Sequence, residues 1–216
     1  MTYVALLRGI NLGRHRRIAM AELRELITSL GHADVVTHLQ SGNVVFKNRR
    51  HDVSKLRGEI EAGIASRFGL EVRVLIRTRG ELARIVETNP LPGAAADPTH
   101  VRVTFLDPRP TSDQVALVDP SEFRPDEFRF GDGVVYVWYR GGILESKLTD
   151  AVWIRRLGVT ATSRNWSTVT RLAGSVPSLL AEAPPRVSAP SQARSRRGGP
   201  PVVPVAPGLP DQVAQL

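Results

Sequence analysis

TYVALLRGINLG over residues 2–13 and LQSGNVVF over residues 39–46 are the stretches that decide the fold of this chain. Residues 3–8 predict a strand, which the glycines within residues 9–13 bring to an end. Apolar residues then recur at helical spacing from a start near Ala19, and Gly31 stops the helix. The β-branched run 35–39 and residues 44–46 flank Ser41-Gly42-Asn43, which predicts a hairpin.

The pattern continues with a second helix and a fourth strand. Asp52 is a suitable N-cap for a helix that Gly69 ends, and residues 72–76 alternate as in a half-buried strand. The element order is therefore β-α-β-β-α-β, the ferredoxin-like plait. Thr78 and Glu81 form the capping-box signature of a connecting helix, which a Pro- and Ala-rich linker follows.

The same pattern restarts after the linker, although no sequence repeat is visible. Residues 101–105 predict a strand, followed by a short helix around Val115 and a hairpin about Gly131-Asp132-Gly133. A helix is predicted from Leu144 to Gly158, then a short strand over residues 159–161 and a last helix capped by Ser163.

We therefore predict an α+β protein with two tandem ferredoxin-like (α/β plait) subdomains. The expected boundaries are 1–78 for the first subdomain, 79–99 for the connecting helix and linker, and 100–183 for the second subdomain with its extra helix. Residues 184–216 form a Pro/Arg-rich tail without apolar periodicity, for which we expect disorder.

Composition excludes several classes of protein. The chain has no cysteine, so disulfides, thiol catalysis and cysteine–metal sites are excluded. Its five histidines have no metal-ligand spacing, which predicts no metal site, and no run approaches the ~18 apolar residues of a membrane span. We expect a cytoplasmic protein without a membrane partner. The net charge of +8 favours a polyanionic partner only slightly, because arginine rather than lysine dominates, as in a G+C-rich genome.

Four motifs in order resemble a known family. They are Leu6–Asn11 (LLRGIN), Leu39–Phe46 (LQSGNVVF), Ser146–Thr149 (SKLT) and Thr162–Val169 (TSRNWSTV). Together they resemble the bacterial domain of unknown function 1697 (DUF1697) family over roughly residues 1–180. The resemblance implies two ferredoxin-like subdomains in tandem, and it implies no activity or cofactor. The basic run Arg14–Arg17 departs from the glycine and the lysine or asparagine that the family often has there.

Topology brings the first pair of loops together. In this plait the first two strands are parallel, so the loop after the first strand (residues 9–13) and the hairpin turn at residues 40–43 emerge at one sheet edge. Backbone N–H groups, glycines and a basic flank at such an edge suit a phosphate-like anion. The predicted ligand-binding residues are Arg8, Gly9, Asn11, Gly13, Gln40, Ser41 and Asn43. The alternative is that they only form tight turns, with Arg8 bonded to a carbonyl group.

A second cluster is predicted by the same topology in the second half. Arginine and lysine with nearby hydroxyl groups suit a phosphate or a carboxylate. The predicted residues are Arg140, Gly141, Ser146, Lys147, Thr162, Arg164 and Asn165. The alternative has Ser163 as an N-cap, Arg164 paired with Glu145 or Asp150, and Trp166 in the core.

The sequence supports three classes of function. The first is binding of a small phosphate-bearing ligand at the loop after the first strand and the hairpin turn at residues 40–43. The others are a nucleic-acid-binding module and a hydrolase or transferase of unassigned chemistry. No nucleophile elbow or pair of carboxylates identifies a catalytic site; His38 lies near Ser41 in the sequence, but no third group to orient them can be named.

Overall fold

The computed structural model has an α+β fold and describes residues 1–13, 16–49, 52–91, 93 and 96–174. The predicted tail, 184–216, lies outside these residues. The N-terminal half contains β1 (Thr2–Leu7), α1 (Met20–Ser29), β2 (Ala33–His38), β3 (Asn43–Lys47), α2 (Val53–Phe68) and β4 (Val74–Thr78). Its sheet is antiparallel, in the order β2-β3-β1-β4.

Local signals place these elements. Ala19 is the N-cap of α1, and the Asp52 side chain accepts a hydrogen bond from the Lys55 N–H at the start of α2. Gly69 ends α2 in the left-handed conformation, and Gly42 has a φ of 75° in the β2–β3 turn. The predicted strand, helix and hairpin order of this half is confirmed.

Helix α3 (Arg79–Glu87) connects the two halves, and the capping box between Thr78 and Glu81 is present in full. The C-terminal half then contains β5 (Val101–Asp107), α4 (Ser112–Ala116), the 3-10 turn η1 (Pro120–Phe123), β6 (Glu127–Gly131), β7 (Val134–Trp138), α5 (Asp150–Leu157), β8 (Thr160–Asn165) and α6 (Trp166–Ala173). Its four strands form a second antiparallel sheet, in the order β6-β7-β5-β8.

Two predictions for this half are wrong in detail. Leu144 does not begin a helix, since α5 starts at Asp150 and the Leu144 side chain is 99% exposed. Ser163 is not an N-cap, because β8 pairs with β5 along its whole length and Asn165 takes the cap position. The ladder with β5 satisfies more backbone groups than an early helix start would, so pairing overrides the local capping signal.

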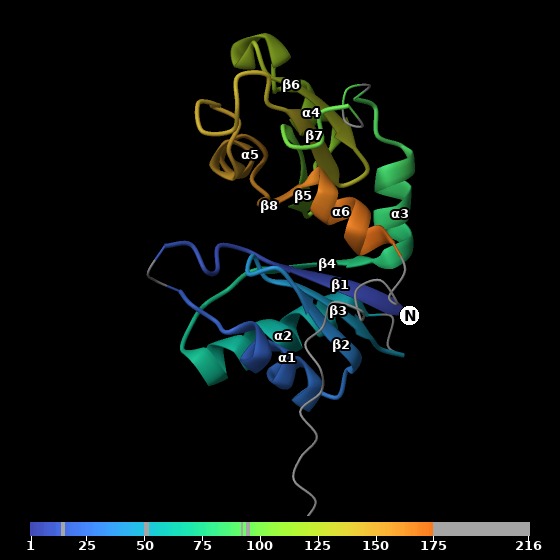
Figure 1. The fold of residues 1–216 in the computed structure, drawn as a ribbon. Helices are drawn as coiled ribbons and strands as arrows, with labels where there is room; N and C mark the ends of the chain where they lie inside the picture. Colours follow the sequence, from blue (N-terminus) through green and yellow to red (C-terminus); the bar gives the residue numbers. More distant parts are fainter. Residues whose placement is uncertain (14–15, 50–51, 92, 94–95, 175–216) are drawn as a thin grey trace, which may run out of the picture. The chain divides into compact units, whose positions relative to one another are not determined.

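Three apolar clusters hold the structure together. Figure 1 shows α1 and α2 on the same face of the first sheet, where they enclose one cluster. A second cluster lies between the second sheet and α5. The third joins the two halves: Val4 and Leu6 of β1 pack in it with Val103 and Phe105 of β5, and α3 and α6 add residues to it. Tyr136 is 1% exposed in this shared core, so its sheet face is not an open surface.

Candidate functional site

The two polar loops of the N-terminal half lie side by side, as predicted. The Leu7 N–H donates to the Gly42 carbonyl at 2.9 Å, and Asn11 Nδ2 donates to the Gln40 carbonyl at 2.8 Å. Asn11 also bonds the Ile18 backbone in both directions, through Nδ2 and Oδ1. Asn11 therefore ties the loops together, and both of its amide hydrogens are already used.

Arg164 of β8 joins the two halves. It is 7% exposed, and its Nη2 donates to the carbonyls of Leu7 at 2.7 Å and Ser41 at 3.2 Å. Its Nε donates to Asn43 Oδ1 at 2.6 Å, while Nη1 donates to Thr162 Oγ1 and the Ser163 carbonyl, both at 2.9 Å. A guanidinium has five N–H donors, and all five are used here.

This geometry corrects the predicted role of Arg164. Its donors hold protein acceptors rather than a ligand, and none of its five hydrogen bonds goes to Glu145 or Asp150. Burial lowers the pKa of Arg164 to about 10, so the side chain is still a cation at neutral pH. Arg164 therefore contributes a fixed positive charge and positions the loops around it.

A cavity of about 760 Å³ adjoins Arg164 and is lined from both halves. Six of the predicted residues line it: Arg8, Gly9, Ser41, Thr162, Arg164 and Asn165. The two clusters inferred from the sequence thus supply residues to a single cavity. Two more predicted residues, Asn11 and Asn43, lie behind the wall and hold its loops and Arg164 in place.

The remaining predicted residues do not line the cavity. Arg140 lies 3.6 Å from the centre of the Trp138 ring and pairs with Glu127 at 2.6 Å. Ser146 Oγ accepts the Leu148 N–H in a local turn. The others that lie outside the lining are Gly13, Gln40, Gly141 and Lys147.

The charge of the cavity lining is strongly positive. Among the described residues it contains four arginines (Arg8, Arg16, Arg102 and Arg164) and one carboxylate, that of Asp150. Asp150 already accepts hydrogen bonds from the Ser163 N–H, at 3.2 Å, and from its hydroxyl group. Because the single carboxylate is engaged and outnumbered, the lining favours an anion.

Two of these arginines are available to a ligand. Neither Arg8 nor Arg102 makes a side-chain hydrogen bond or ion pair within the part of the chain that the structure describes, and Arg102 Nε is a buried donor without a partner. Arg8 follows β1 and Arg102 lies in β5, so the two cations come from different halves. A buried unpaired donor is costly, which gives an anionic acceptor a direct gain there.

Two helices begin at the same cavity. Thr149, Asp150 and Ala151 of the α5 start and Asn165 and Thr168 of the α6 start line it. Neither N-cap residue, Thr149 or Asn165, makes a side-chain capping bond. First-turn N–H groups and the helix dipole both favour an anion at such a place.

Sequence reasoning missed several lining residues, above all Arg102, Tyr139, Thr149, Asp150 and Thr168. Arg102 had a signal, because it is a charged residue between two valines of a strand that the pattern predicts. No pattern in the sequence indicated that Tyr139 lines the cavity. In the structure its hydroxyl donates to the Leu148 carbonyl at 3.0 Å, and burial raises the pKa of Tyr139 to about 12.

The contact between the two halves contains a second buried arginine, Arg77, at what we call the opposite end of the interface. Its hydrogen bonds resemble those of Arg164, but its neighbouring charged residues differ. Arg77 of β4 pairs with Val4 of β1, as Arg164 pairs with Val103 of β5. Arg77 Nη2 donates to the carbonyls of Leu106 at 2.6 Å and Gly133 at 3.4 Å. These carbonyls occupy positions that correspond to those of Leu7 and the β2–β3 turn, so each half donates to the other through an equivalent arginine.

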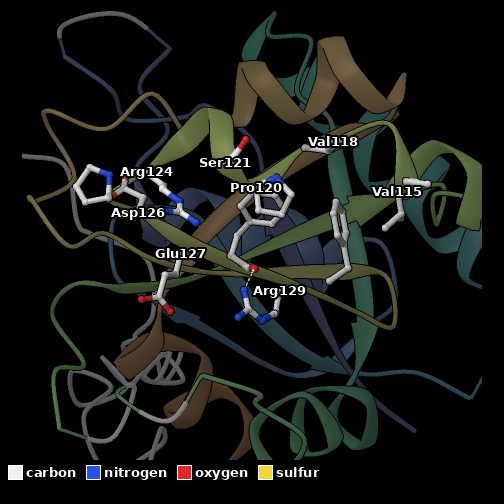
Figure 2. Close-up of a pocket in the computed structure, with 12 residues that line it drawn as sticks. Val115, Val118, Pro120, Ser121, Arg124, Asp126, Glu127 and Arg129 are labelled. Atoms are coloured by element: carbon white, nitrogen blue, oxygen red, sulfur yellow. Dashed lines mark hydrogen bonds between the residues drawn. The ribbon is translucent and has the colours of Figure 1, made fainter.

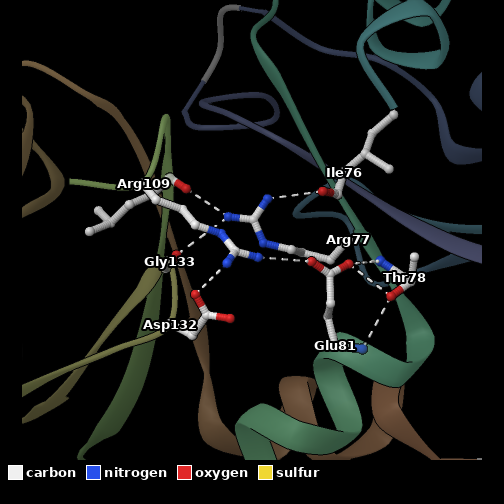
Figure 3. A network of polar contacts seen from close by, with 8 residues as sticks. Ile76, Arg77, Thr78, Glu81, Arg109, Asp132 and Gly133 are labelled. Atoms are coloured by element: carbon white, nitrogen blue, oxygen red, sulfur yellow. Dashed lines mark hydrogen bonds and ion pairs between the residues drawn. The ribbon is translucent and has the colours of Figure 1, made fainter. Parts of the chain in front are cut away.

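Ion pairs neutralise that opposite end. Figure 3 shows Arg109 between Asp132, at 2.5 Å, and Glu81, at 3.5 Å, beside Arg77. Arg57 pairs with Asp107, the last residue of β5, whose position corresponds to that of Arg8 in the N-terminal half. Burial raises the pKa of Glu81, but hydrogen bonds from Thr78 and the charges of Arg77 and Arg109 outweigh it and bring the pKa below its usual value.

A groove of about 940 Å³ along β6 is larger but less suited to a charged ligand (Figure 2). Three of its four charged residues, Asp126, Glu127 and Arg129, already have protein partners. Arg129 donates to the Phe128 carbonyl at 2.8 Å, and Asp126 accepts the Arg140 N–H at 2.9 Å. None of the residues predicted from the sequence lines this groove. The smaller cavity is therefore the better candidate site.

Other chemistry has less support in the geometry. The hydroxyl oxygen of Ser41 accepts a hydrogen bond from Asn43 Nδ2 at 3.1 Å, and no bond joins Ser41 to His38 among the described residues. Within the same residues, no three histidine or acidic side chains lie close enough together to hold a metal ion. No helix in the described part of the chain is long and apolar enough to cross a membrane.

Comparisons with known proteins agree with this fold. The structure of the conserved bacterial protein SP0830 from Streptococcus pneumoniae is similar, with a TM-score of 0.60, 22% sequence identity, and coverage of 80% of this chain and 96% of that one. No curated protein matches the sequence. The family described as protein of unknown function (DUF1697) matches residues 1–136, well over half of the 216 residues. The chain therefore belongs to the DUF1697 family.

Proposed function

We propose that this protein binds a small phosphate-bearing anion in the cavity between its two halves. One observation carries the proposal: Arg8 and Arg102, from different halves, line the same cavity without a side-chain partner among the described residues. A guanidinium can hold two phosphate oxygens at once, and a pair of them can clasp one anion from two sides.

The contrast between the two ends of the interface supports the proposal. Both ends have a buried arginine bonded to two carbonyls of the other half. At the end with Arg77, carboxylates balance the neighbouring arginines. At the end with Arg164, an external anion would supply the missing balance, and the N-termini of α5 and α6 would add N–H donors.

The site we propose is smaller than the sequence suggested. Arg8, Gly9, Ser41, Arg102 and the starts of α5 and α6 are its ligand-contacting parts. Asn11, Asn43 and Arg164 position them. We also propose the ferredoxin-like plait for residues 1–78 and for the described part of residues 100–183, which the order of strands and helices supports, and a cytoplasmic location.

Nucleic acid and catalysis are the alternatives from the sequence. The sheet face with Tyr136 is buried, so it offers no stacking platform for bases as in RNA-binding plaits. Salt dependence separates the partners, because a nucleic acid that releases several counterions gives a steep slope of log affinity against log salt, whereas a single phosphate group gives a shallow one. Catalysis would be detected as turnover in a panel of phosphoesters and acyl esters.

Titration calorimetry of the full chain with inorganic phosphate tests the proposal. Arg8→Met and Arg102→Met each remove a charged hydrogen-bond donor worth about 1.5–3 kcal/mol, and we expect each to weaken binding at least tenfold. Arg155→Met is the matched control, because Arg155 is exposed in α5 and does not line the cavity. If inorganic phosphate gives no saturable signal, or if both variants bind like the wild type, the proposal is wrong.

A further inference from the structure

The wall of the cavity is not uniformly polar. Leu12, in the first β-α loop, and Leu39, before the β2–β3 turn, both line it, and their side chains are 72% and 55% exposed. Ile143, from the segment after β7, adds a partly buried apolar side chain from the other half. Exposed leucines are individually ordinary, but three separate segments here supply apolar side chains to one cavity that also contains Arg8 and Arg102, which have no side-chain partner in the described part of the chain.

The backbone at Leu39 adds to this observation. Leu39 has a φ of 59°, in the left-handed region that glycine and asparagine adopt far more readily than leucine. Glycine or asparagine would fit this conformation better, so the conformation does not account for a leucine. A contact of the exposed side chain with a ligand would account for it.

The size of the cavity also exceeds what a bare phosphate requires. Its 760 Å³ lies within the range of about 300–1,000 Å³ that is typical of sites for drug-sized organic ligands. Such sites combine a mostly apolar wall with a few polar groups that fix the orientation. Here Arg8 and Arg102 are the charged groups without a protein partner among the described residues, and Leu12, Leu39 and Ile143 supply the apolar part of a wall that also contains hydroxyl and amide side chains.

We infer that the ligand of this cavity is an organic phosphate monoester with an apolar or aromatic substituent, which Leu12 and Leu39 contact while Arg8 and Arg102 hold the phosphate. This inference rests on the proposed anion site and names the class of compound that the site takes. Burial of apolar surface of the substituent then adds to the affinity that the arginines provide.

A series of phosphate monoesters tests the inference on the full chain. Methyl phosphate, butyl phosphate and phenyl phosphate have the same anionic group and differ in apolar surface. We expect butyl and phenyl phosphate to bind at least tenfold more tightly than methyl phosphate in calorimetry, which corresponds to about 1.4 kcal/mol at 25 °C.

Variants of the two leucines assign that gain to the apolar wall. Leu12→Ser and Leu39→Asn should weaken phenyl phosphate at least fivefold and change methyl phosphate less than twofold. Asparagine tolerates the left-handed backbone, so the second variant keeps the turn. Leu117→Ser is the matched control, since Leu117 is also 72% exposed but lies outside the cavity.

The outcomes separate this inference from the proposed function. If methyl phosphate binds and the three esters have equal affinity, the anion site stands and the apolar ligand class is wrong. A gain for butyl and phenyl phosphate that persists in Leu12→Ser and Leu39→Asn also overturns the inference. If neither the esters nor inorganic phosphate bind, the proposed function itself fails.

Discussion

Replacement of Arg164 by methionine is the most direct test of the structure around the candidate site. Methionine keeps an unbranched apolar stem but removes all five N–H donors. Three acceptors of the N-terminal half then lose their partner: the Leu7 carbonyl, the Ser41 carbonyl and Asn43 Oδ1. Each buried acceptor left unpaired costs about 1–3 kcal/mol.

The net loss is smaller than the sum of these costs. Water from the adjoining cavity can reach some of the acceptors, and the variant no longer has to bury a cation, which itself is unfavourable. We therefore expect Arg164→Met to lower the free energy of unfolding by about 3–5 kcal/mol. For a chain of this size that corresponds to a decrease in Tm of about 6–20 °C.

Urea unfolding followed by circular dichroism measures this loss, with two controls. Arg77→Met removes the related arginine at the opposite end and should cost a similar amount, because Arg77 also donates to two carbonyls of the other half. Arg155→Met, on the exposed surface of α5, should change stability by less than about 0.5 kcal/mol. A loss below about 1 kcal/mol for Arg164→Met would contradict the assignment of Arg164 as the residue that joins the halves.

Three further predictions concern single positions. Gly42→Ala should cost more stability than Gly31→Ala in urea unfolding, by about 1–3 kcal/mol. Both glycines have positive φ, but a Cβ at Gly42 would lie 2.6 Å from Ile10 Cδ1, whereas one at Gly31 meets nothing within 4 Å. Equal losses of stability would mean that the overlap with Ile10 is relieved at no cost. Burial and, secondarily, the charge of Arg171 lower the pKa of His38 below its usual 6.5, so the unfolded chain binds more protons than the folded one as pH decreases from about 6.5, and stability should fall. This part of the pH dependence of stability should disappear in His38→Gln. A His38→Gln variant with an unchanged pH profile would contradict the prediction. Asn11→Asp replaces the amide donor to the Ile18 and Gln40 carbonyls by a carboxylate. The change should lower the free energy of unfolding by about 1–3 kcal/mol and broaden the NMR signals of the loop. Unchanged stability would show that Asn11 does not tie the loops together.

The sequence by itself determined the local features of the fold. Period-two and helical patterns located most strands and helices, because each pattern records which face of an element is buried. Glycine at position 42, Asp52 as an N-cap and the box between Thr78 and Glu81 are local too: each depends on a backbone conformation or a bond within three residues. The convergence of the first two loops also followed from the sequence, since element order fixes which loops share a sheet edge.

Only the tertiary structure decided which of the candidate residues form the site. Arg164 and Asn43 are 121 residues apart in the chain, and no local pattern indicates that they bond each other. The same packing placed Arg102 in the cavity without a partner among the residues that the structure describes, and at the opposite end gave Arg109 two carboxylates. Whether an arginine binds a ligand or holds the protein together depends on which acceptors surround it. Contacts between distant segments set those surroundings, so the sequence alone could not distinguish Arg8 from Arg164.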